Sequence, residues 1–135
     1  MKRTFNEDYK CGLTNEKKVI NYLNDNGHNY KQYKNKCELF DFTDGRNICE
    51  LKSRNNDYDK YPTTIFGQNK IENLQDDKIY WFYFLFKDGL YRWKFNKDEY
   101  TIKTNGRSDR GRNEYKPHCN VNIKYLSLVT KDITS

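Results

Sequence analysis

The amino-acid sequence predicts a mixed α/β fold in which helices flank a central mixed β-sheet. Apolar side chains recur at helical spacing after Gly12 and again after Pro62, which indicates two helices. Two Asp-Gly turns each separate runs of β-branched and aromatic residues, a pattern typical of antiparallel hairpins. No Gly/Ser-rich linker divides the chain, so residues 1–135 are expected to form one domain.

The first helix is expected to follow Gly12, with Thr14 or Asn15 as its N-cap and Asn26-Gly27 at its end. A first strand is expected within residues 28–36. The polar stretch that begins at Ser53 and ends near Tyr61 is rich in Asn and Asp, and we expect it to be a loop.

The second half of the chain alternates one further helix with strands. Pro62 opens a predicted helix that continues to about Gln75. Residues 79–86 are almost wholly apolar and aromatic, which indicates a central strand covered on both faces. A second hairpin joins this strand to residues 90–95, and residues 121–129 are expected to form the closing strand.

The first hairpin surrounds an Asp44-Gly45 turn and is the best-defined local feature. A loop with an even number of residues sets Phe42 opposite Cys49 and Phe40 opposite Leu51, all on one apolar face. A loop with an odd number would mix the two faces and bury charge. The hydrophobic pattern therefore selects the even-numbered loop.

The same register sets two acids, Asp41 and Glu50, directly opposite each other, with Lys52 two residues along on the same face. Two facing carboxylates destabilise a bare hairpin, and a divalent cation between them reverses the sign of that interaction. The alternative is a solvated, charged hairpin face. An acid two residues before a lysine occurs five times in the chain, but only Glu50 lies in an apolar, β-branched context with a second acid across from it. The pattern therefore predicts a metal site.

A third acid, Glu16, falls on the core-facing stripe of the first helix. Val19, Ile20 and Leu23 follow it by three, four and seven residues, the spacing of one helix face. One interpretation is a first-turn glutamate that the helix dipole favours and that reaches solvent. The other is a carboxylate that points at the acidic pair of the hairpin.

Composition restricts the class of protein and of partner. The formal net charge of +6 favours a polyanionic partner. The 4 cysteines include no CxxC pair, which favours buried reduced thiols over disulfides or zinc ligands. The most apolar run, residues 79–86, is too short to cross a bilayer, so we expect no membrane span and an intracellular protein.

The order of these elements, with Asp41 and the triplet Glu50-Leu51-Lys52 on neighbouring strands, resembles the PD-(D/E)xK nuclease superfamily. Restriction endonucleases, Holliday junction resolvases and many viral and phage nucleases share that fold. The resemblance spans roughly residues 9–126 and implies a restriction endonuclease-like αβββαβ core. Phe40 stands where the superfamily pattern has proline. The motifs do not distinguish a viral or phage nuclease from a resolvase-like one.

The resemblance implies a role for each residue of the hairpin motif. Asp41 and Glu50 would bind Mg²⁺ or Mn²⁺ together with the backbone carbonyl of Leu51, since all-oxygen ligation suits these ions. Lys52 would orient the attacking water, lower its pKa or steady the charged transition state. Glu16 resembles the helix carboxylate that many members place near a second metal or its water shell.

Further candidates lie outside the motif. Gln68 or Lys70 is expected to contribute from the second helix, although either side chain can equally face solvent. Basic residues of a predicted loop at 105–113 and just beyond it are candidate contacts to a phosphate backbone, and a merely solvated basic loop is the alternative. The candidate DNA contacts are Lys70, Arg107, Arg110, Arg112 and Lys116.

The function expected from the sequence is that of a metal-dependent DNA endonuclease, with branched or flapped DNA as a candidate substrate. The resemblance also implies products with a 5′-phosphate and a 3′-hydroxyl, and a two-fold homodimer would fit a resolvase. Two alternatives remain: a non-catalytic nucleic-acid-binding module on the same fold, and an RNA nuclease.

Overall fold

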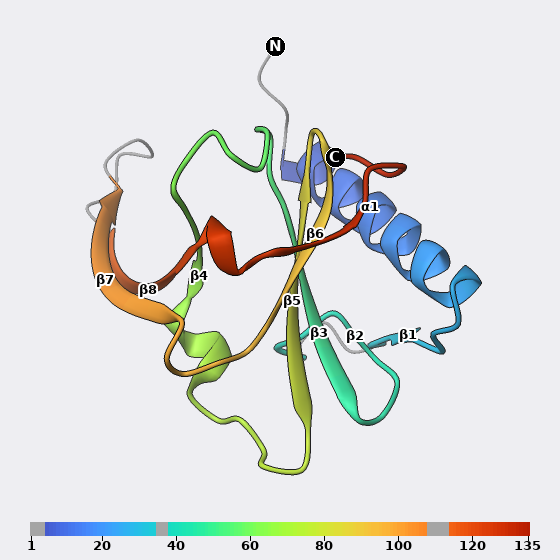
Figure 1. The fold of residues 1–135 in the computed structure, drawn as a ribbon, viewed down its shortest axis with the longest axis horizontal. Helices are drawn as coiled ribbons and strands as arrows, with labels where there is room; N and C mark the ends of the chain where they lie inside the picture. Colours follow the sequence, from blue (N-terminus) through green and yellow to red (C-terminus); the bar gives the residue numbers. More distant parts are fainter. Residues whose placement is uncertain (1–4, 35–37, 108–113) are drawn as a thin grey trace.

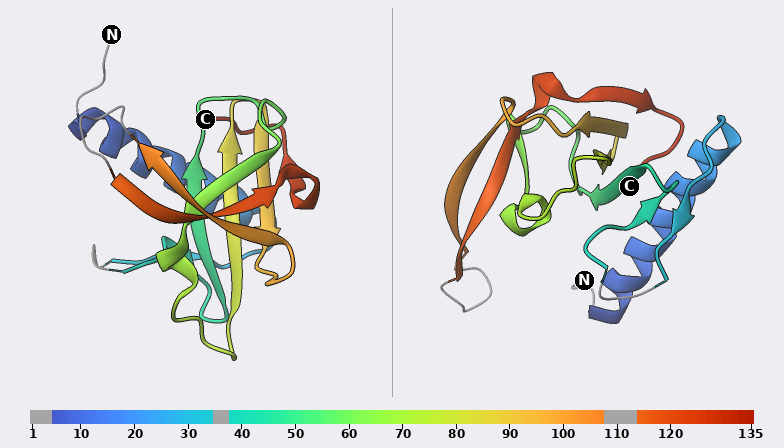
Figure 2. Two further views of the ribbon diagram at one scale, coloured as in Figure 1. Left: turned by 90° about the vertical axis from the view of Figure 1, so that its left-hand side faces the viewer. Right: turned by 90° about the horizontal axis from the view of Figure 1, so that it is seen from below.

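The computed structural model describes residues 5–34, 38–107 and 114–135, which form three layers (Figure 1). A helix covers one face of a six-stranded sheet, and a three-stranded sheet covers the other face, as the view from below shows (Figure 2). The mixed α/β class and the mixed central sheet are confirmed. The second covering helix is not found among the described residues, where the second sheet takes its place.

Helix α1 runs without a break from Phe5 to Asp25, so the prediction that it begins after Gly12 is wrong. Its end is as predicted: Gly27 has a φ of 100°, and His28 N–H donates to the carbonyl of Leu23 at 3.1 Å. Within the described part of the chain, no helix combines the length and the apolar character needed to cross a membrane.

The six-stranded sheet has the order β1-β2-β3-β5-β6-β9. Strands β3 and β5 pair in parallel and all other neighbours are antiparallel, which makes the sheet mixed. The expected strand at 28–36 is reduced to the two residues of β1. The strands are β1 (Lys31–Gln32), β2 (Phe42–Thr43), β3 (Asn47–Ser53), β5 (Ile79–Phe86), β6 (Gly89–Lys94) and β9 (Ser127–Thr130).

The second sheet has the order β4-β8-β7 and contains β4 (Thr63–Gly67), β7 (Tyr100–Arg107) and β8 (Glu114–Asn122). The predicted helix from Pro62 to Gln75 is therefore wrong: its first part is β4, followed only by the 3-10 turn η1 (Gln68–Ile71). Thr63 to Phe66 are β-branched or aromatic and alternate in burial, which suits a strand that pairs with β8.

The region after β6 also differs from expectation. The predicted loop at 105–113 begins inside β7, which continues to Arg107. The predicted closing strand at 121–129 is divided between β8 and β9 by the 3-10 turn η2 (Ile123–Tyr125). Strands β7 and β8 instead pair in an antiparallel hairpin, which forms most of the second sheet.

Strand β5 is covered on both faces, as predicted. Phe82, Phe84 and Phe86 face the second sheet, whereas Tyr83 and Leu85 face α1. All five are at most 2% exposed, and each buried side chain of this size contributes about 1.5–3 kcal/mol. Strand β5 therefore holds α1 and the second sheet in place on its two faces. The same two layers lie on either side of β3, which pairs with β5 in parallel. Cys49 and Cys119 are buried free thiols, as expected; Cys11 and Cys37 lie outside the described side chains.

Candidate active site

The β2–β3 hairpin positions the predicted motif. Its register pairs Phe42 with Cys49 and Thr43 with Ile48, which confirms the even-numbered loop. Asp44 closes the turn because its Oδ1 accepts hydrogen bonds from the N–H groups of Arg46 (3.0 Å) and Asn47 (2.7 Å).

The ladder between β2 and β3 ends at Asp41. Asp41 N–H donates to the carbonyl of Cys49 at 2.9 Å, one residue out of the predicted register. Phe40 packs on the rings of Tyr80 and Phe82, with centroid distances of 5.3 and 6.2 Å, on the face that meets the second sheet. The prediction that Phe40 shares the face of Phe42 is wrong, because the shift in register at Asp41 turns Phe40 toward these two rings on the other face.

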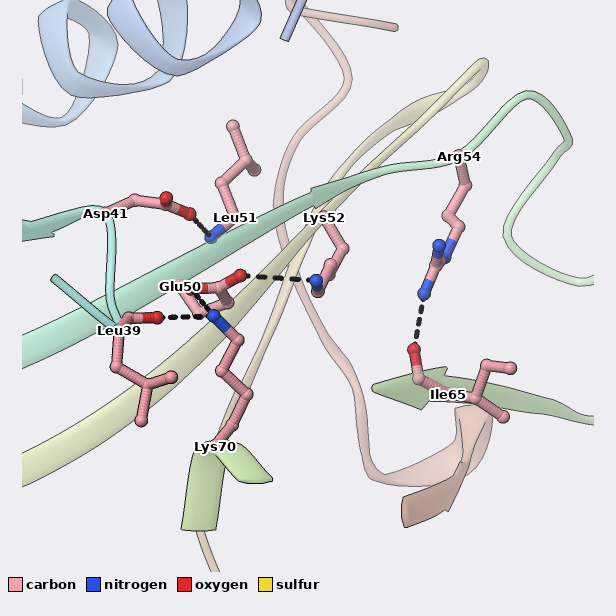
Figure 3. A network of polar contacts seen from close by, with 8 residues as sticks. All are labelled: Leu39, Asp41, Glu50, Leu51, Lys52, Arg54, Ile65 and Lys70. Atoms are coloured by element: carbon pink, nitrogen blue, oxygen red, sulfur yellow. Dashed lines mark hydrogen bonds and ion pairs between the residues drawn. The ribbon is translucent and has the colours of Figure 1, made fainter. Parts of the chain in front are cut away.

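Asp41 consequently lies at the edge of β3 and not squarely opposite Glu50. Its Oδ2 accepts a 2.7 Å hydrogen bond from Leu51 N–H (Figure 3). The N–H and carbonyl of one strand residue point toward the same neighbouring strand, so the Leu51 carbonyl also faces this edge. Two of the three predicted ligand groups, the Asp41 carboxylate and the Leu51 carbonyl, thus lie along the same edge of β3, beyond the end of β2.

Glu50 is only 3% exposed and pairs with Phe82 of β5, on the face toward the second sheet. Two ammonium groups flank its carboxylate: Lys52 Nζ is 3.3 Å from Oε1, and Lys70 Nζ is 3.3 Å from Oε2 (Figure 3). Lys70 Nζ also donates to the carbonyl of Leu39. Despite the ion pair, Oε2 accepts no hydrogen bond from any described residue and is fully buried.

The surroundings of Glu50 disfavour the ionised form of its carboxyl group. Burial raises the pKa of the Glu50 carboxyl to about 7, and the charge of Asp41 adds to the increase, while Lys52 and Lys70 oppose it. Without a metal ion, the site therefore favours the protonated form of Glu50 more than solvent favours it for an exposed glutamate. A divalent cation would favour the ionised form more strongly than either lysine does.

Glu16 projects from α1 and is half-buried. Its Oε1 accepts a 2.7 Å hydrogen bond from Gln32 Nε2 on β1. Burial raises the pKa of Glu16, the hydrogen bond from Gln32 lowers it, and the charge of Asp41 raises it. Asp41 therefore lies within electrostatic reach of both Glu16 and Glu50.

The other predicted residues lie in different parts of the molecule. Gln68 is half-exposed at the start of η1, from which Lys70 reaches Glu50. Lys116 is exposed on β8, in the second sheet, and the backbone of Arg107 ends β7. Arg110 and Arg112 lie outside the described residues. The structure thus joins Lys70 to the acidic motif and leaves Lys116 on the separate β7–β8 hairpin.

Sequence reasoning missed two features of the site. The pairing of Lys70 with Glu50 depends on where η1 lies, which no local pattern reveals. Arg54 continues the row of Glu50 and Lys52 along one face of the chain, and it donates a hydrogen bond to the carbonyl of Ile65 on β4 (Figure 3). Strand alternation was the signal for Arg54, because it lies two residues beyond Lys52.

Whether a metal ion fits can be judged from the donor groups. No cluster of three His, Cys, Asp or Glu side chains arranged to hold a metal ion occurs among the described residues. A site made by Asp41, Glu50 and the Leu51 carbonyl needs only two carboxylates. Its donors are all oxygen, and one is a buried carboxylate oxygen without a hydrogen bond, so the residues present suit Mg²⁺ or Mn²⁺.

Comparison with known protein families matches most of the chain to a nuclease family. A family model with the description "Phage putative PDDEXK endonuclease" matches residues 26–129, most of the chain. The matched span includes Asp41, Glu50 and Lys52, whereas Glu16 precedes it. No curated protein and no solved structure matches the chain.

Proposed function

We propose that this chain, which belongs to the phage PDDEXK endonuclease family, is a metal-dependent endonuclease that hydrolyses DNA. The observation that supports this most directly is the Glu50 carboxylate. It is buried, it lies within electrostatic reach of a second carboxylate, and one of its oxygens has no hydrogen bond from a described residue. A buried acid in this state costs free energy in the metal-free fold, and a bound divalent cation would offset that cost.

Asp41, Glu50 and the Leu51 carbonyl are the groups that would hold the ion. Bound Mg²⁺ or Mn²⁺ would supply Lewis-acid stabilisation of the charge that develops on the phosphate. Asp41 has a second task, because its Oδ2 also fixes the backbone at Leu51 through a 2.7 Å hydrogen bond. This bond aligns Asp41 with the carbonyl that completes the ligand set.

Lys52 is the proposed catalytic cation. Its ammonium group contacts the buried Glu50 carboxylate at 3.3 Å. Because the Lys52 side chain is also 30% exposed, it reaches the solvent from which DNA would bind. A fixed ammonium group at this position can orient the attacking water and stabilise negative charge on the scissile phosphate. Typical losses on removing one such group are about 10²–10³-fold in rate.

Lys70 is proposed to neutralise the Glu50 carboxylate when no metal ion is bound. Its ammonium group lies 3.3 Å from the same Glu50 oxygen that lacks a hydrogen bond. Lys70 would therefore compete with a bound divalent cation for this oxygen. Once Glu50 has another counter-charge, Lys70 is available to contact a DNA phosphate, the role that the sequence suggested for it.

The direct experiment incubates the purified protein with plasmid DNA, flapped DNA and matched RNA, in Mg²⁺ and in EDTA. We expect internal cleavage of DNA in Mg²⁺, none in EDTA, and none in either condition for Asp41→Asn. DNA binding without cleavage in any metal would support a non-catalytic module on the same fold instead. Faster cleavage of the matched RNA would assign the site to an RNA nuclease.

A further inference from the structure

A pocket adjoins the row formed by Glu50, Lys52 and Arg54. Lys52 and Arg54 point to the same side of the chain, and Arg54 is held there by its hydrogen bond to Ile65 (Figure 3). Beyond Arg54, residues 55–62 connect β3 to β4 and partly enclose an open pocket of about 370 Å³ that Phe86 of β5 also lines. This volume lies within the range of about 300–1,000 Å³ that is usual for small-ligand pockets.

The lining of the pocket combines aromatic rings with a few polar groups. The residues that matter here are Arg54, Asn56, Tyr58, Tyr61, Thr63 and Phe86. Tyr58 is fixed, because its ring stacks on Tyr91 at a centroid distance of 4.5 Å and its N–H donates to Asp88 at 3.0 Å. The pocket therefore has a rigid aromatic wall and needs no large rearrangement to bind a planar group.

Tyr61 differs from Tyr58 because the residue is 54% exposed. The ammonium group of Lys60 lies 5.5 Å from its centroid. An exposed ring beside a pocket, with a cation near its face, provides a stacking surface for an incoming base.

The charges around the pocket indicate which part of a nucleotide it would take. Asp57 and Asp59 lie in the enclosing segment, and Asp88 contacts Tyr58. Tyr91, on which the lining residue Tyr58 stacks, lies within electrostatic reach of two of these acids: burial raises the pKa of Tyr91, and the charges of Asp88 and Asp59 raise it further. Arg54 is the charged residue in the lining and already donates to the Ile65 carbonyl, and the three acids lie nearby, so the aromatic lining favours an uncharged planar ring with polar edges over a phosphate.

We propose that this pocket binds an unpaired nucleobase of the DNA strand whose phosphate lies against Lys52. This inference rests on the proposed nuclease function. Two residues of an extended chain span about 6.6–6.8 Å, and successive nucleotides of a duplex strand rise about 3.4 Å, so the base is within about two nucleotides of the phosphate. Bases stacked and paired in a duplex cannot enter. The pocket therefore selects flapped, branched or single-stranded DNA.

The test measures binding in EDTA, so that it does not depend on cleavage. The probes are two fluorescent duplexes that carry single-stranded flaps of the same length. In one probe the flap has normal bases, and in the other every flap nucleotide is abasic. We expect the wild-type protein to bind the base-bearing flap about tenfold more tightly, as expected for loss of one stacked base. Tyr61→Ala should remove this difference, and Tyr61→Phe, which keeps the ring, should preserve it.

Tyr125→Ala is the matched control. Tyr125 is also an exposed tyrosine, with the Lys124 ammonium group 5.0 Å from its ring, but it lies on η2 and does not line this pocket. Equal affinity of the wild-type protein for the two flaps, or an equal loss in Tyr125→Ala and Tyr61→Ala, would overturn the pocket assignment. Mg²⁺-dependent cleavage without a preference for the base-bearing flap would refute only the proposal that the pocket binds a base. A preference for the base-bearing flap without cleavage in any metal would refute only the proposed nuclease activity.

Discussion

Asp41 holds the backbone of β3 through the 2.7 Å hydrogen bond from Leu51 N–H to its Oδ2. The same carboxylate raises the pKa of Glu50, second to burial, through its charge. Asp41 therefore stabilises the strand through one interaction and destabilises the metal-free site through another. Substitutions that separate these two effects can test its proposed role as a ligand.

Asp41→Asn is expected to weaken Mn²⁺ binding by at least about tenfold while leaving the fold intact. The amide oxygen can still accept the hydrogen bond from Leu51, and loss of the charge relieves repulsion with Glu50 and Glu16. The melting temperature in EDTA should therefore be equal to or higher than that of the wild-type protein. Asp41→Ala is the contrasting variant, since it also loses the acceptor and should melt at a lower temperature. Unchanged Mn²⁺ affinity in Asp41→Asn, measured by calorimetry, would remove Asp41 from the ligand set.

Lys52→Ala is expected to reduce the rate of DNA cleavage by about 10²–10³-fold. DNA affinity should change far less, because one of many cationic contacts is lost. Lys97→Ala, at an exposed lysine on the turn before β7, is the matched control and should cleave at the wild-type rate. Single-turnover rates in saturating Mg²⁺ measure the effect. Near wild-type cleavage by Lys52→Ala would exclude this lysine from the chemistry.

The parts of the fold that the sequence predicted correctly are those fixed by nearby residues. The Asp44-Gly45 turn specifies its own geometry, so the register of Phe42 with Cys49 followed from local chemistry. The run Ile79–Phe86 is apolar at successive positions, which already implies cover on both faces. The structure of the segment after Pro62 is not fixed by nearby residues. It is a strand because β8 pairs with it from more than fifty residues away, and this pairing overrides its helix-start signals.

In the candidate site, too, some features follow from local sequence and others depend on tertiary packing. Strand alternation alone placed Glu50 and Lys52 on one face, as the ion pair between them requires. The position of Asp41 at the strand edge depends on Phe40, whose ring packs on Tyr80 and Phe82 of a distant strand. The contact of Lys70 with Glu50 likewise depends on η1, which follows β4. Tertiary packing sets both, so no sequence pattern could reveal them.

Lys70→Met is expected to tighten Mn²⁺ binding at pH 8.5, where Glu50 is ionised. The variant removes the ammonium group 3.3 Å from Glu50 Oε2, and with it a cation that competes for that oxygen. The gain should be about tenfold, which corresponds to about 1.4 kcal/mol for removal of the competing ion pair. Lys78→Met is the control, because Lys78 also donates to a hairpin carbonyl, that of Gly45 at 2.6 Å, but has no contact with the acids. Calorimetric titration distinguishes the two variants, and weaker Mn²⁺ binding in Lys70→Met would contradict competition for Glu50.

The stability of the metal-free protein is expected to fall as the pH rises from about 4.5 to about 7. Burial, followed by the charge of Asp41, raises the pKa of Glu50 from 4.5 to about 7 in the folded protein. In this interval the folded state binds more protons than the unfolded state, so the stabilising contribution present below pH 4.5 is lost as Glu50 ionises. The contribution is on the order of 3 kcal/mol.

Urea unfolding in EDTA at pH 5 and pH 8 measures this loss. Glu50→Gln should show a smaller decrease between the two pH values, because its side chain cannot ionise. Glu72→Gln, at an exposed glutamate just after η1, should keep the wild-type decrease. Mg²⁺ should restore stability at pH 8 in the wild-type protein and not in Glu50→Gln, since only an ionised carboxylate at this position favours the cation. A wild-type pH dependence in Glu50→Gln would show that a different group is responsible.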